Sequence, residues 1–337
     1  MDPLGLAAPG ARPIPGFKGA EFAREGAILP QLIEDLWAER DVAKRNNDAP
    51  MSQAVKILMN SFYGVLGASG CRFHDTRLAS SITLRGHEII RRSRERIETL
   101  GHQVIYGDTD SVFVLLGDGV SESDAQQRGV ELARDLNTWW HAVIADEFDL
   151  PCHLEMEFET HFLRFLMPTV RGELTGSKKR YAGLVRGSSG HELVFKGLES
   201  VRTDWTPLAR RFQRELYRRV FEGEACEPFV HQTLADLLSG KFDEELIYRK
   251  RLRRRVEDYL RNVPPHVQAA RKLGGNVRWI RYIITSTGPE PVVDREPLPR
   301  PDYDHYRERQ LAPAADGILQ FLDTSFAQIT DQQIDMF

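Results

Sequence analysis

The sequence predicts an α+β fold, in which helices pack on antiparallel strands. Helical periodicity covers three segments, at about 29–63, 78–100 and 122–147. Two apolar β-type runs flank a tight polar turn in VIYGDTDSVFVLL, and further β-like segments follow at about 153–167 and 180–197. Beyond Thr203 the chain becomes mainly helical and basic, so we place a domain boundary there.

The composition is typical of a soluble globular protein. Hydrophobic residues make up 41% and charged residues 28% of the 337 residues, and the formal net charge is −4. No apolar run approaches the roughly 20 residues that a membrane-spanning helix needs. The first residues lack a basic start followed by an apolar segment, so they do not predict a signal peptide. Without a C-x-x-C pair, Cys71, Cys152 and Cys226 are expected to be idle or buried thiols.

The first elements are a connector and a pair of helices. Residues 1–27 are rich in Pro, Gly and Ala, which is typical of a connector. The stretch Asn46–Pro50 combines a turn with helix-start residues, so helices over 29–46 and 51–63 should form an antiparallel hairpin. The first helix has an apolar stripe of Leu32, Ile33, Leu36 and Trp37. We expect Val55, Leu58, Met59 and Phe62 to fill the inner face of the second.

The sharpest chemical signal is a pair of carboxylates in Tyr106–Ser111. Side chains alternate along an extended chain, so Asp108 and Asp110 should project to the same side, with Gly107 permitting the bend. Two carboxylates held together repel unless a cation neutralises them, and Mg²⁺ prefers such oxygen ligands. A solvated Asp-rich turn is the simpler alternative, but the apolar runs on both sides favour a structured metal-binding hairpin.

A second constellation is a polar helix face. Lys56, Asn60 and Tyr63 stand at i, i+4 and i+7, so they share one face of the second helix. Arg40 and Lys44 are also four residues apart on the first helix. An antiparallel hairpin can bring the three cations together, and such a group suits a triphosphate. A merely solvated basic face is the alternative, and it would be favoured for Arg40 and Lys44 alone.

These segments, in this order, resemble family B DNA polymerases. K-x-x-x-N-S-x-Y-G is similar to the family's nucleotide-contacting fingers motif, and Y-G-D-T-D-S to its metal-binding palm motif. Lys178–Gly183 (KKRYAG) resembles the segment that lines the primer–template duplex, and Phe195–Glu199 with Arg202 and Asp204 resembles the link from palm to thumb. The fuller wording, such as NSFYGVLGASGCRF, RLASSIT and TGSKKRYAGL, is similar to bacterial members.

The resemblance implies a domain order. It places a helical fingers hairpin at 28–65, a palm with an antiparallel sheet and packed helices at 66–203, and a mainly helical thumb at 204–327. Residues 328–337 would form a tail. We find no segment that corresponds to the family's N-terminal and exonuclease domains, and we expect these to be absent from the 337 residues.

The resemblance also implies roles for single residues. Asp108 and Asp110, with Asp110 the main ligand, would hold metal in a reaction that uses two Mg²⁺ ions, and Lys56 would act with them. Arg40, Lys44 and Lys56 would bind the dNTP triphosphate, while Asn60 and Tyr63 would line the nascent base pair. The expected primer–template contacts are Lys178, Lys179, Arg180, Tyr181 and Lys196. Glu155, Glu157 and Glu159 are expected on an exposed strand face, although one of them is a candidate metal support.

One family motif is missing from the sequence. Family B enzymes carry a further catalytic carboxylate in an S-L-Y-P-S type motif before the fingers, and we find none here. A two-metal site then lacks its bridging ligand, so we expect these 337 residues alone to polymerise poorly or not at all.

Two further segments suggest binding. The cations Arg249, Lys250, Arg251, Arg253, Arg254 and Arg255 would contact duplex phosphates, although on a helix they would spread around the surface and remain merely solvated. The last five residues, Gln333, Ile334, Asp335, Met336 and Phe337, resemble the bacterial sliding-clamp-binding peptide. Packing of this tail on its own thumb is the alternative.

We therefore expect a template-directed DNA polymerase that extends a primer with dNTPs. The rival is a binding module that holds primer–template and clamp without catalysis, and a different D-x-D phosphoryl-transfer enzyme is remote. The expected partners are primer–template DNA, dNTPs and a bacterial sliding clamp, with no membrane. We expect a monomer in the bacterial cytoplasm, associated with the nucleoid.

Overall fold

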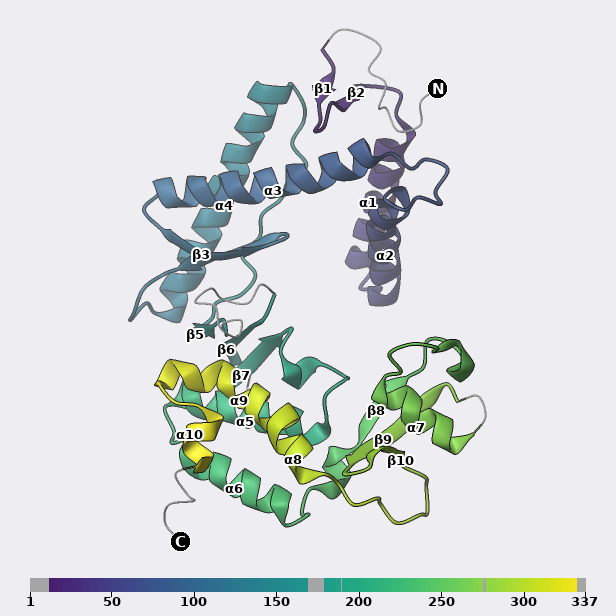
Figure 1. Cartoon of the computed structure of the whole chain (residues 1–337). Coiled ribbons are helices and arrows are strands. Elements are labelled where there is room, and N and C mark those ends of the chain that lie inside the picture. The colour runs from purple at the N-terminus through teal and green to yellow at the C-terminus, as the bar shows by residue number, and fades with distance from the viewer. Residues whose placement is uncertain (1–11, 169–178, 189, 275–276, 332–337) are drawn as a thin grey trace. The chain divides into compact units, whose positions relative to one another are not determined.

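The computed structural model describes residues 12–168, 179–188, 190–274 and 277–331 (Figure 1). The chain divides into two compact units, Met1–Glu159 and Thr160–Phe337. This division falls inside the segment 66–203 that the sequence assigns to a palm. The fingers, palm and thumb boundaries therefore stay predictions, whereas the mixture of helices with small antiparallel sheets agrees with the predicted α+β class.

The first unit is built mainly from four helices and a β-hairpin (Figure 1). All four of its helices match the expected ranges within a few residues, and the helical hairpin is present. Its elements are β1 (Ile14–Pro15), β2 (Glu21–Phe22), α1 (Ile28–Arg45), α2 (Ala49–Leu66), α3 (Thr76–Thr99), β3 (Gln103–Asp108), β4 (Ser111–Leu115) and α4 (Glu122–Phe148). The expected connector thus contains a short strand pair, β1–β2.

The turn between α1 and α2 explains why the hairpin forms. Asn47 adopts a left-handed conformation with φ of 54°, which asparagine tolerates better than most residues. Asp48 then caps α2, because its Oδ1 accepts a hydrogen bond of 3.0 Å from the backbone amide of Met51. Pro50 lies in the first turn, where no amide hydrogen is required.

The core of the first unit lies between the β-hairpin and two helices. Ile97 of α3, Val104 of β3 and Leu136 of α4 form one buried cluster. Trp140 of α4 is also buried, and its indole Nε1 donates a hydrogen bond of 2.9 Å to Ser93 Oγ of α3. These contacts fix β3 and β4 against both helices.

The expected strand over 153–167 is mostly wrong. Only β5 (Arg164–Leu166) is a strand, and residues 149–162 have no regular secondary structure. The side chain of Asn137 on α4 explains the difference. Its amide donates to the carbonyl of Met156 at 2.9 Å, and its oxygen accepts from the backbone amide of Met156 at 2.7 Å. The extended segment is thus held by a side chain instead of a neighbouring strand at this point.

The second unit contains two three-stranded antiparallel sheets and several helices. The first sheet has the order β5–β6–β7 and the second β10–β9–β8. Besides β5, its strands and α-helices are β6 (Tyr181–Gly187), β7 (Gly190–Lys196), α5 (Pro207–Glu222), α6 (Glu227–Leu238), β8 (Tyr248–Arg251), α7 (Pro265–Leu273), β9 (Trp279–Thr285), β10 (Gly288–Pro291), α8 (Tyr303–Tyr306), α9 (Ala312–Leu319) and α10 (Phe326–Asp331). The region beyond Thr203 is thus helical as expected, but it also contains a sheet.

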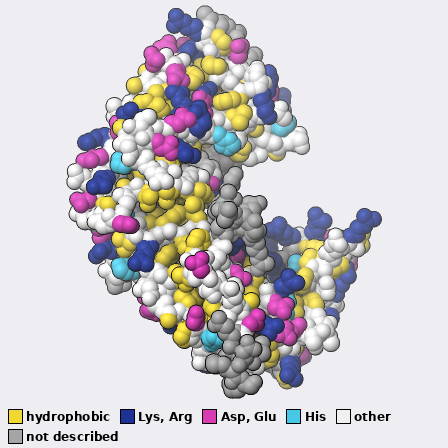
Figure 2. Space-filling model, turned by 60° about the vertical axis from the view of Figure 1, so that its left-hand side comes forward, with side chains coloured by type: hydrophobic (Ala, Val, Ile, Leu, Met, Phe, Trp, Pro, Cys, Tyr) yellow, Lys and Arg dark blue, Asp and Glu magenta, His cyan; other side chains and the backbone are white. Residues whose placement is uncertain are grey.

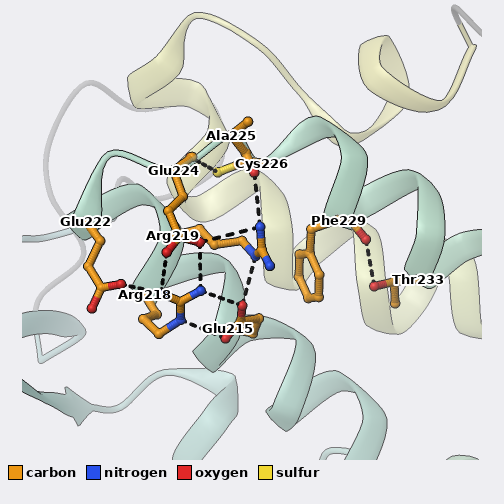
Figure 3. A network of polar contacts seen from close by, with 9 residues as sticks. All are labelled: Glu215, Arg218, Arg219, Glu222, Glu224, Ala225, Cys226, Phe229 and Thr233. Carbon is orange, nitrogen blue, oxygen red and sulfur yellow. Dashed lines mark hydrogen bonds and ion pairs between the residues drawn. The ribbon is translucent and has the colours of Figure 1, made fainter.

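A large hydrophobic core holds the second unit together. Phe212, Leu216 and Tyr217 of α5 are fully buried in it, together with residues of α6, α9 and β9. At the end of α5, Arg218 forms ion pairs with Glu215, Glu222 and Glu224 (Figure 3). These ion pairs lie at the junction between α5 and α6.

Two expectations from composition can be checked. Cys71, Cys152 and Cys226 are free thiols, and only Cys226 is buried. Within the described ranges, every helix is too short or too polar to span a lipid bilayer.

Candidate active site

The carboxylate pair lies at the tip of the β3–β4 hairpin. Asp108 pairs with Ser111 in antiparallel register, and the amide of Asp110 donates to the carbonyl of Asp108. A bond between residues two apart closes a γ-turn, whose centre here is Thr109 with φ of 48°. The sequence placed the bend at Gly107, but that residue lies in β3 and has no positive φ.

The geometry of this turn changes the argument about the two carboxylates. Strand alternation cannot place both on one side, because the chain reverses at Thr109. They are instead the two ends of one three-residue turn. Asp108 is half-buried and Asp110 is exposed. Thr109 Oγ1 donates to Asp108 Oδ1 (2.9 Å), and Ser111 Oγ donates to Asp110 Oδ1 (3.3 Å).

The chemistry of the turn suits a hard cation, but the number of ligands is small. Carboxylate and hydroxyl oxygens are the donors that Mg²⁺ accepts. Within the described ranges, no group of three or more His, Cys, Asp or Glu residues could hold a metal. Glu155, Glu157 and Glu159 are exposed side chains of the extended segment, which agrees with their expected solvent exposure.

The predicted polar face of α2 is exposed. Lys56 and Asn60 face solvent, and Tyr63 is 47% exposed. The hydroxyl of Tyr63 shares a hydrogen bond of 2.8 Å with Thr83 Oγ1 on α3. On the opposite face Val55 is buried as expected, but the expectation for Leu58 is wrong because its side chain is 48% exposed.

On α1 the two predicted cations differ in environment. Lys44 is exposed, whereas Arg40 is half-buried. The Nε of Arg40 is buried and has no hydrogen-bond partner in the described part of the chain. A buried donor without an acceptor costs free energy. Arg40 and Lys56 both lie about one and a half to two helical turns from the connecting turn, so the hairpin places them at similar heights.

Helix α3 links the polar face of α2 to the carboxylate turn. Thr83 of α3 bonds Tyr63, and Ile90 Cγ2 lies 3.4 Å from where a Cβ would stand on Gly107. Thr83 and Ile90 are seven residues apart, so they share one face of α3 about 10 Å apart along its axis. The two predicted constellations are therefore held by the same helix within one unit.

The KKRY segment lies in the second unit, where Lys178 falls outside the described residues. Lys179 has φ of 66°, a left-handed conformation that is unfavourable for lysine. Gly197 allows it, since a Cβ there would stand 2.2 Å from the carbonyl oxygen of Lys179. Tyr181 and Lys196 are cross-strand partners on β6 and β7. Backbone strain of this kind concentrates at functional sites.

Arg180 is engaged inside the second unit. Its guanidinium forms an ion pair with the buried carboxylate of Glu199. Gln213 of α5 donates to Glu199 Oε2 (2.7 Å) and accepts from the amide of Ser200 (2.7 Å). Sequence reasoning missed Gln213, although a Gln on the apolar face of α5 was a detectable signal.

The link after Glu199 carries another ion pair. Arg202 forms a two-point contact with Asp204, with distances of 3.0 and 2.7 Å. The hydrogen bonds from Arg202 hold the pKa of Asp204 below its ordinary value, and Lys250 adds to the shift from 3.7 Å away. Lys250 is thus held by Asp204 in addition to any role in binding.

The basic run lies on a strand and the loop after it, so a helical placement is wrong. Arg249, Lys250 and Arg251 belong to β8, and Arg253, Arg254 and Arg255 follow as exposed residues. The burial of Tyr248 and Leu252 at either end and pairing with β9 fix the strand. Lys and Arg side chains gather on the part of the second unit that holds β8–β10 (Figure 2). The tail Gln333–Phe337 lies outside the described residues.

Comparison with known protein families matches residues 19–280 to "DNA polymerase family B". The chain belongs to this family. It is 49% identical over 355 aligned residues to DNA polymerase II of Escherichia coli K12, which confirms the predicted likeness to bacterial members of the family.

More distant family B relatives are also similar. The chain is 28% identical over 335 residues to a DNA polymerase of Thermococcus sp. 9oN-7, and 30% identical over 275 residues to the DNA polymerase alpha catalytic subunit of Sterkiella nova. These alignments cover 90% and 73% of the chain, against 100% for the E. coli protein. The chain spans 45%, 40% and 17% of the length of the E. coli, Thermococcus and Sterkiella proteins respectively.

Proposed function

We propose that this chain provides the nucleotide-binding and metal-binding part of a template-directed DNA polymerase. The observation that carries the proposal is the arrangement around α3, which holds the Asp108–Asp110 turn and the Lys56, Asn60 and Tyr63 face within one unit. Family membership supports DNA-directed DNA synthesis as the reaction. The chain spans less than half the length of these relatives, so the activity of such a whole protein is assigned to it only as a proposal.

In this proposal each group has a distinct task. Arg40, Lys44 and Lys56 bind the triphosphate through their cationic groups. Asn60 and Tyr63 line the base pair that forms. Because phosphoryl transfer depends on positioning and electrostatics, fixed cations and carboxylates are the expected machinery.

Asp110 and Asp108 would hold Mg²⁺, and two ions are proposed for the complete site. Bound Mg²⁺ supplies neutralisation of the charge that develops on the phosphate. The exposed carboxylate of Asp110 is accessible to a hydrated ion, whereas half-buried Asp108 also accepts from Thr109. A further carboxylate is needed beside this turn, and the described residues provide none.

Nucleotide binding tests the proposal directly. We expect Lys56→Ala to weaken binding of a fluorescent dNTP, in Mg²⁺ with primer–template, by about tenfold or more, since it removes a charge-assisted contact. Chelating Mg²⁺ should weaken dNTP binding by the wild-type chain. Asp110→Asn should make dNTP binding depend less on Mg²⁺. Fluorescence anisotropy measures all three.

Arg45→Ala is the matched control, because Arg45 is an exposed cation of the same hairpin outside the proposed triphosphate group. The dNTP affinity of the Arg45→Ala variant should stay within about twofold of that of the wild type. Equal losses for Arg45→Ala and Lys56→Ala would show a general charge effect and contradict the proposed site.

The Asp108–Asp110 turn offers few metal ligands, which also favours a second candidate function. In this alternative the chain is a module that binds primer–template and clamp without catalysis. Primer extension separates the two functions. Extension at ordinary polymerase rates by the 337-residue chain would exclude the binding-only role, and it would contradict our expectation of weak activity.

Sliding-clamp binding is proposed for the tail Gln333–Phe337 on its sequence alone. Deleting these five residues should abolish capture of the chain on an immobilised bacterial clamp, because the peptide supplies the expected apolar contacts. Full retention of the truncated chain would refute the assignment.

A further inference from the structure

An exposed aromatic ring lies among cationic side chains on one face of the β8–β9–β10 sheet. Arg251 pairs with Trp279, and Arg249 pairs with Arg281, in antiparallel register. Directly paired residues project to the same face of a sheet, and so do residues two apart on one strand. Arg249, Arg251, Trp279 and Arg281 therefore share one face, which we call the Trp279 face.

Burial separates this face from the core. All four of its side chains are exposed, and Trp279 is 50% exposed. The alternate residues Tyr248, Ile280 and Tyr282 are 8%, 2% and 7% exposed, so they pack into the core together with fully buried Ile283 further along β9. A large aromatic side chain placed on the exposed face contributes little to the core, which favours a ligand-binding role.

The electrostatics of the Trp279 face favour an anion. Arg249 and Arg281 stand directly opposite each other, and like charges in such a pair are destabilising. Arg281 pairs with Asp294 at 2.7 Å, but the Asp294 side chain is 87% exposed, so this ion pair adds little stability. Three guanidiniums thus share the face, and Arg253, Arg254 and Arg255 follow directly after β8.

The position of the ring adds a second requirement on the ligand. The guanidinium of Arg249 lies over the Trp279 ring, with Cζ 4.8 Å from its centroid. A cation stacked on an exposed ring orients that ring and leaves part of its surface to solvent. Unpaired nucleic-acid bases stack on such platforms while cations bind the phosphates. Bases within a duplex stack on each other and present no free ring face.

We propose that the Trp279 face binds an unpaired DNA strand, with a base stacked on Trp279 and phosphates bound by Arg249, Arg251 and Arg281. This inference rests on the proposed DNA-polymerase function for the choice of DNA. It adds a site for single strands that is distinct from nucleotide binding on the first unit, and it assigns Arg249 and Arg251 to an unpaired strand instead of the duplex expected from the sequence.

The test compares two ligands by fluorescence anisotropy, a labelled twelve-residue oligo(dT) and a blunt duplex of the same length. Trp279→Ala should weaken oligo(dT) binding by about tenfold, in line with the loss of one stacked base. The affinity for the duplex should stay within about twofold. Trp279→Phe should retain most of the oligo(dT) affinity, because it keeps an aromatic face, whereas Trp279→Leu should not.

Trp37→Ala is the matched control, since Trp37 of α1 is 47% exposed and lies in the other unit. It should leave oligo(dT) affinity within about twofold. Arg249→Gln and Arg281→Gln should each reduce the slope of log affinity against log salt for oligo(dT) by about 0.7. Circular dichroism establishes that each variant is folded.

Three results would overturn the inference: no oligo(dT) binding by the wild-type chain, unchanged binding by Trp279→Ala, or equal losses for oligo(dT) and duplex. The two proposals fail separately. If Lys56→Ala does not weaken dNTP binding, the proposed nucleotide site fails while the oligo(dT) result still stands. If Trp279→Ala binds oligo(dT) like the wild type, the single-strand site fails while the dNTP result still stands.

Discussion

At the scale of single residues, the second unit shows that a cation in a binding motif can have an internal partner. Arg180 was predicted to contact DNA, but it pairs with Glu199, whose side chain is 7% exposed. Gln213 bonds the other carboxylate oxygen and also donates to Ala314 O at 3.2 Å. This network holds the start of β6, where Lys179 and Tyr181 lie, so Arg180 orients that segment.

Glu199→Ala should therefore lower the free energy of unfolding by about 3 kcal/mol, because it leaves the Arg180 charge without its partner and removes one of the two acceptors of the Gln213 amide. Urea denaturation measures the change. The effect of Arg180→Ala should be less than additive with it, since both remove the same interaction.

Glu222→Ala is the control for this change. Glu222 pairs with Arg218 in an exposed ion pair, and Arg218 keeps Glu215 and Glu224 (Figure 3). The cost should stay below about 0.5 kcal/mol. A cost for Glu199→Ala no larger than this would show that the buried network is not important for stability.

At the scale of elements, local patterns predicted helices better than strands. The α1–α2 hairpin follows from signals within a few residues, such as the Asp48 cap and the turn at Asn47. The segment 153–159 alternates like a strand, yet Asn137 on α4 takes the hydrogen bonds at Met156. A pattern of alternation cannot tell which partner will satisfy the backbone.

The basic run shows the same limit in the opposite direction. Six cations in seven residues give no apolar periodicity, so neither helix nor strand could be inferred from them. Strand β8 forms because β9, about 30 residues later, pairs with it, and because Tyr248 packs into the core. Only this pairing places Arg249 and Arg251 beside Trp279.

At the scale of the whole molecule, the two units have cores of different size. In the described part of the first unit, the largest buried cluster centres on Ile97, Val104 and Leu136. The second unit has an extensive cluster that includes Phe212, Leu216 and Ile283. Since buried apolar area supplies most of the stabilisation, the first unit should be the less stable of the two.

Differential scanning calorimetry should therefore show two transitions. Leu136→Ala should lower the first by several degrees and leave the second unchanged, because Leu136 packs only within the first unit's cluster. Phe212→Ala should lower the second only. A single transition that both variants shift equally would contradict this division into separately stable units.

The sequence by itself determined the family, the α+β class, the helical hairpin and the residues of the carboxylate turn. These rest on local spacing, caps and motif order, which do not depend on distant contacts. Only the tertiary structure decided that the bend lies at Thr109, that Arg180 is bound by Glu199, and that Trp279 lies beside the β8 arginines. Each of these depends on hydrogen bonds, burial or strand register between segments, which no local pattern specifies.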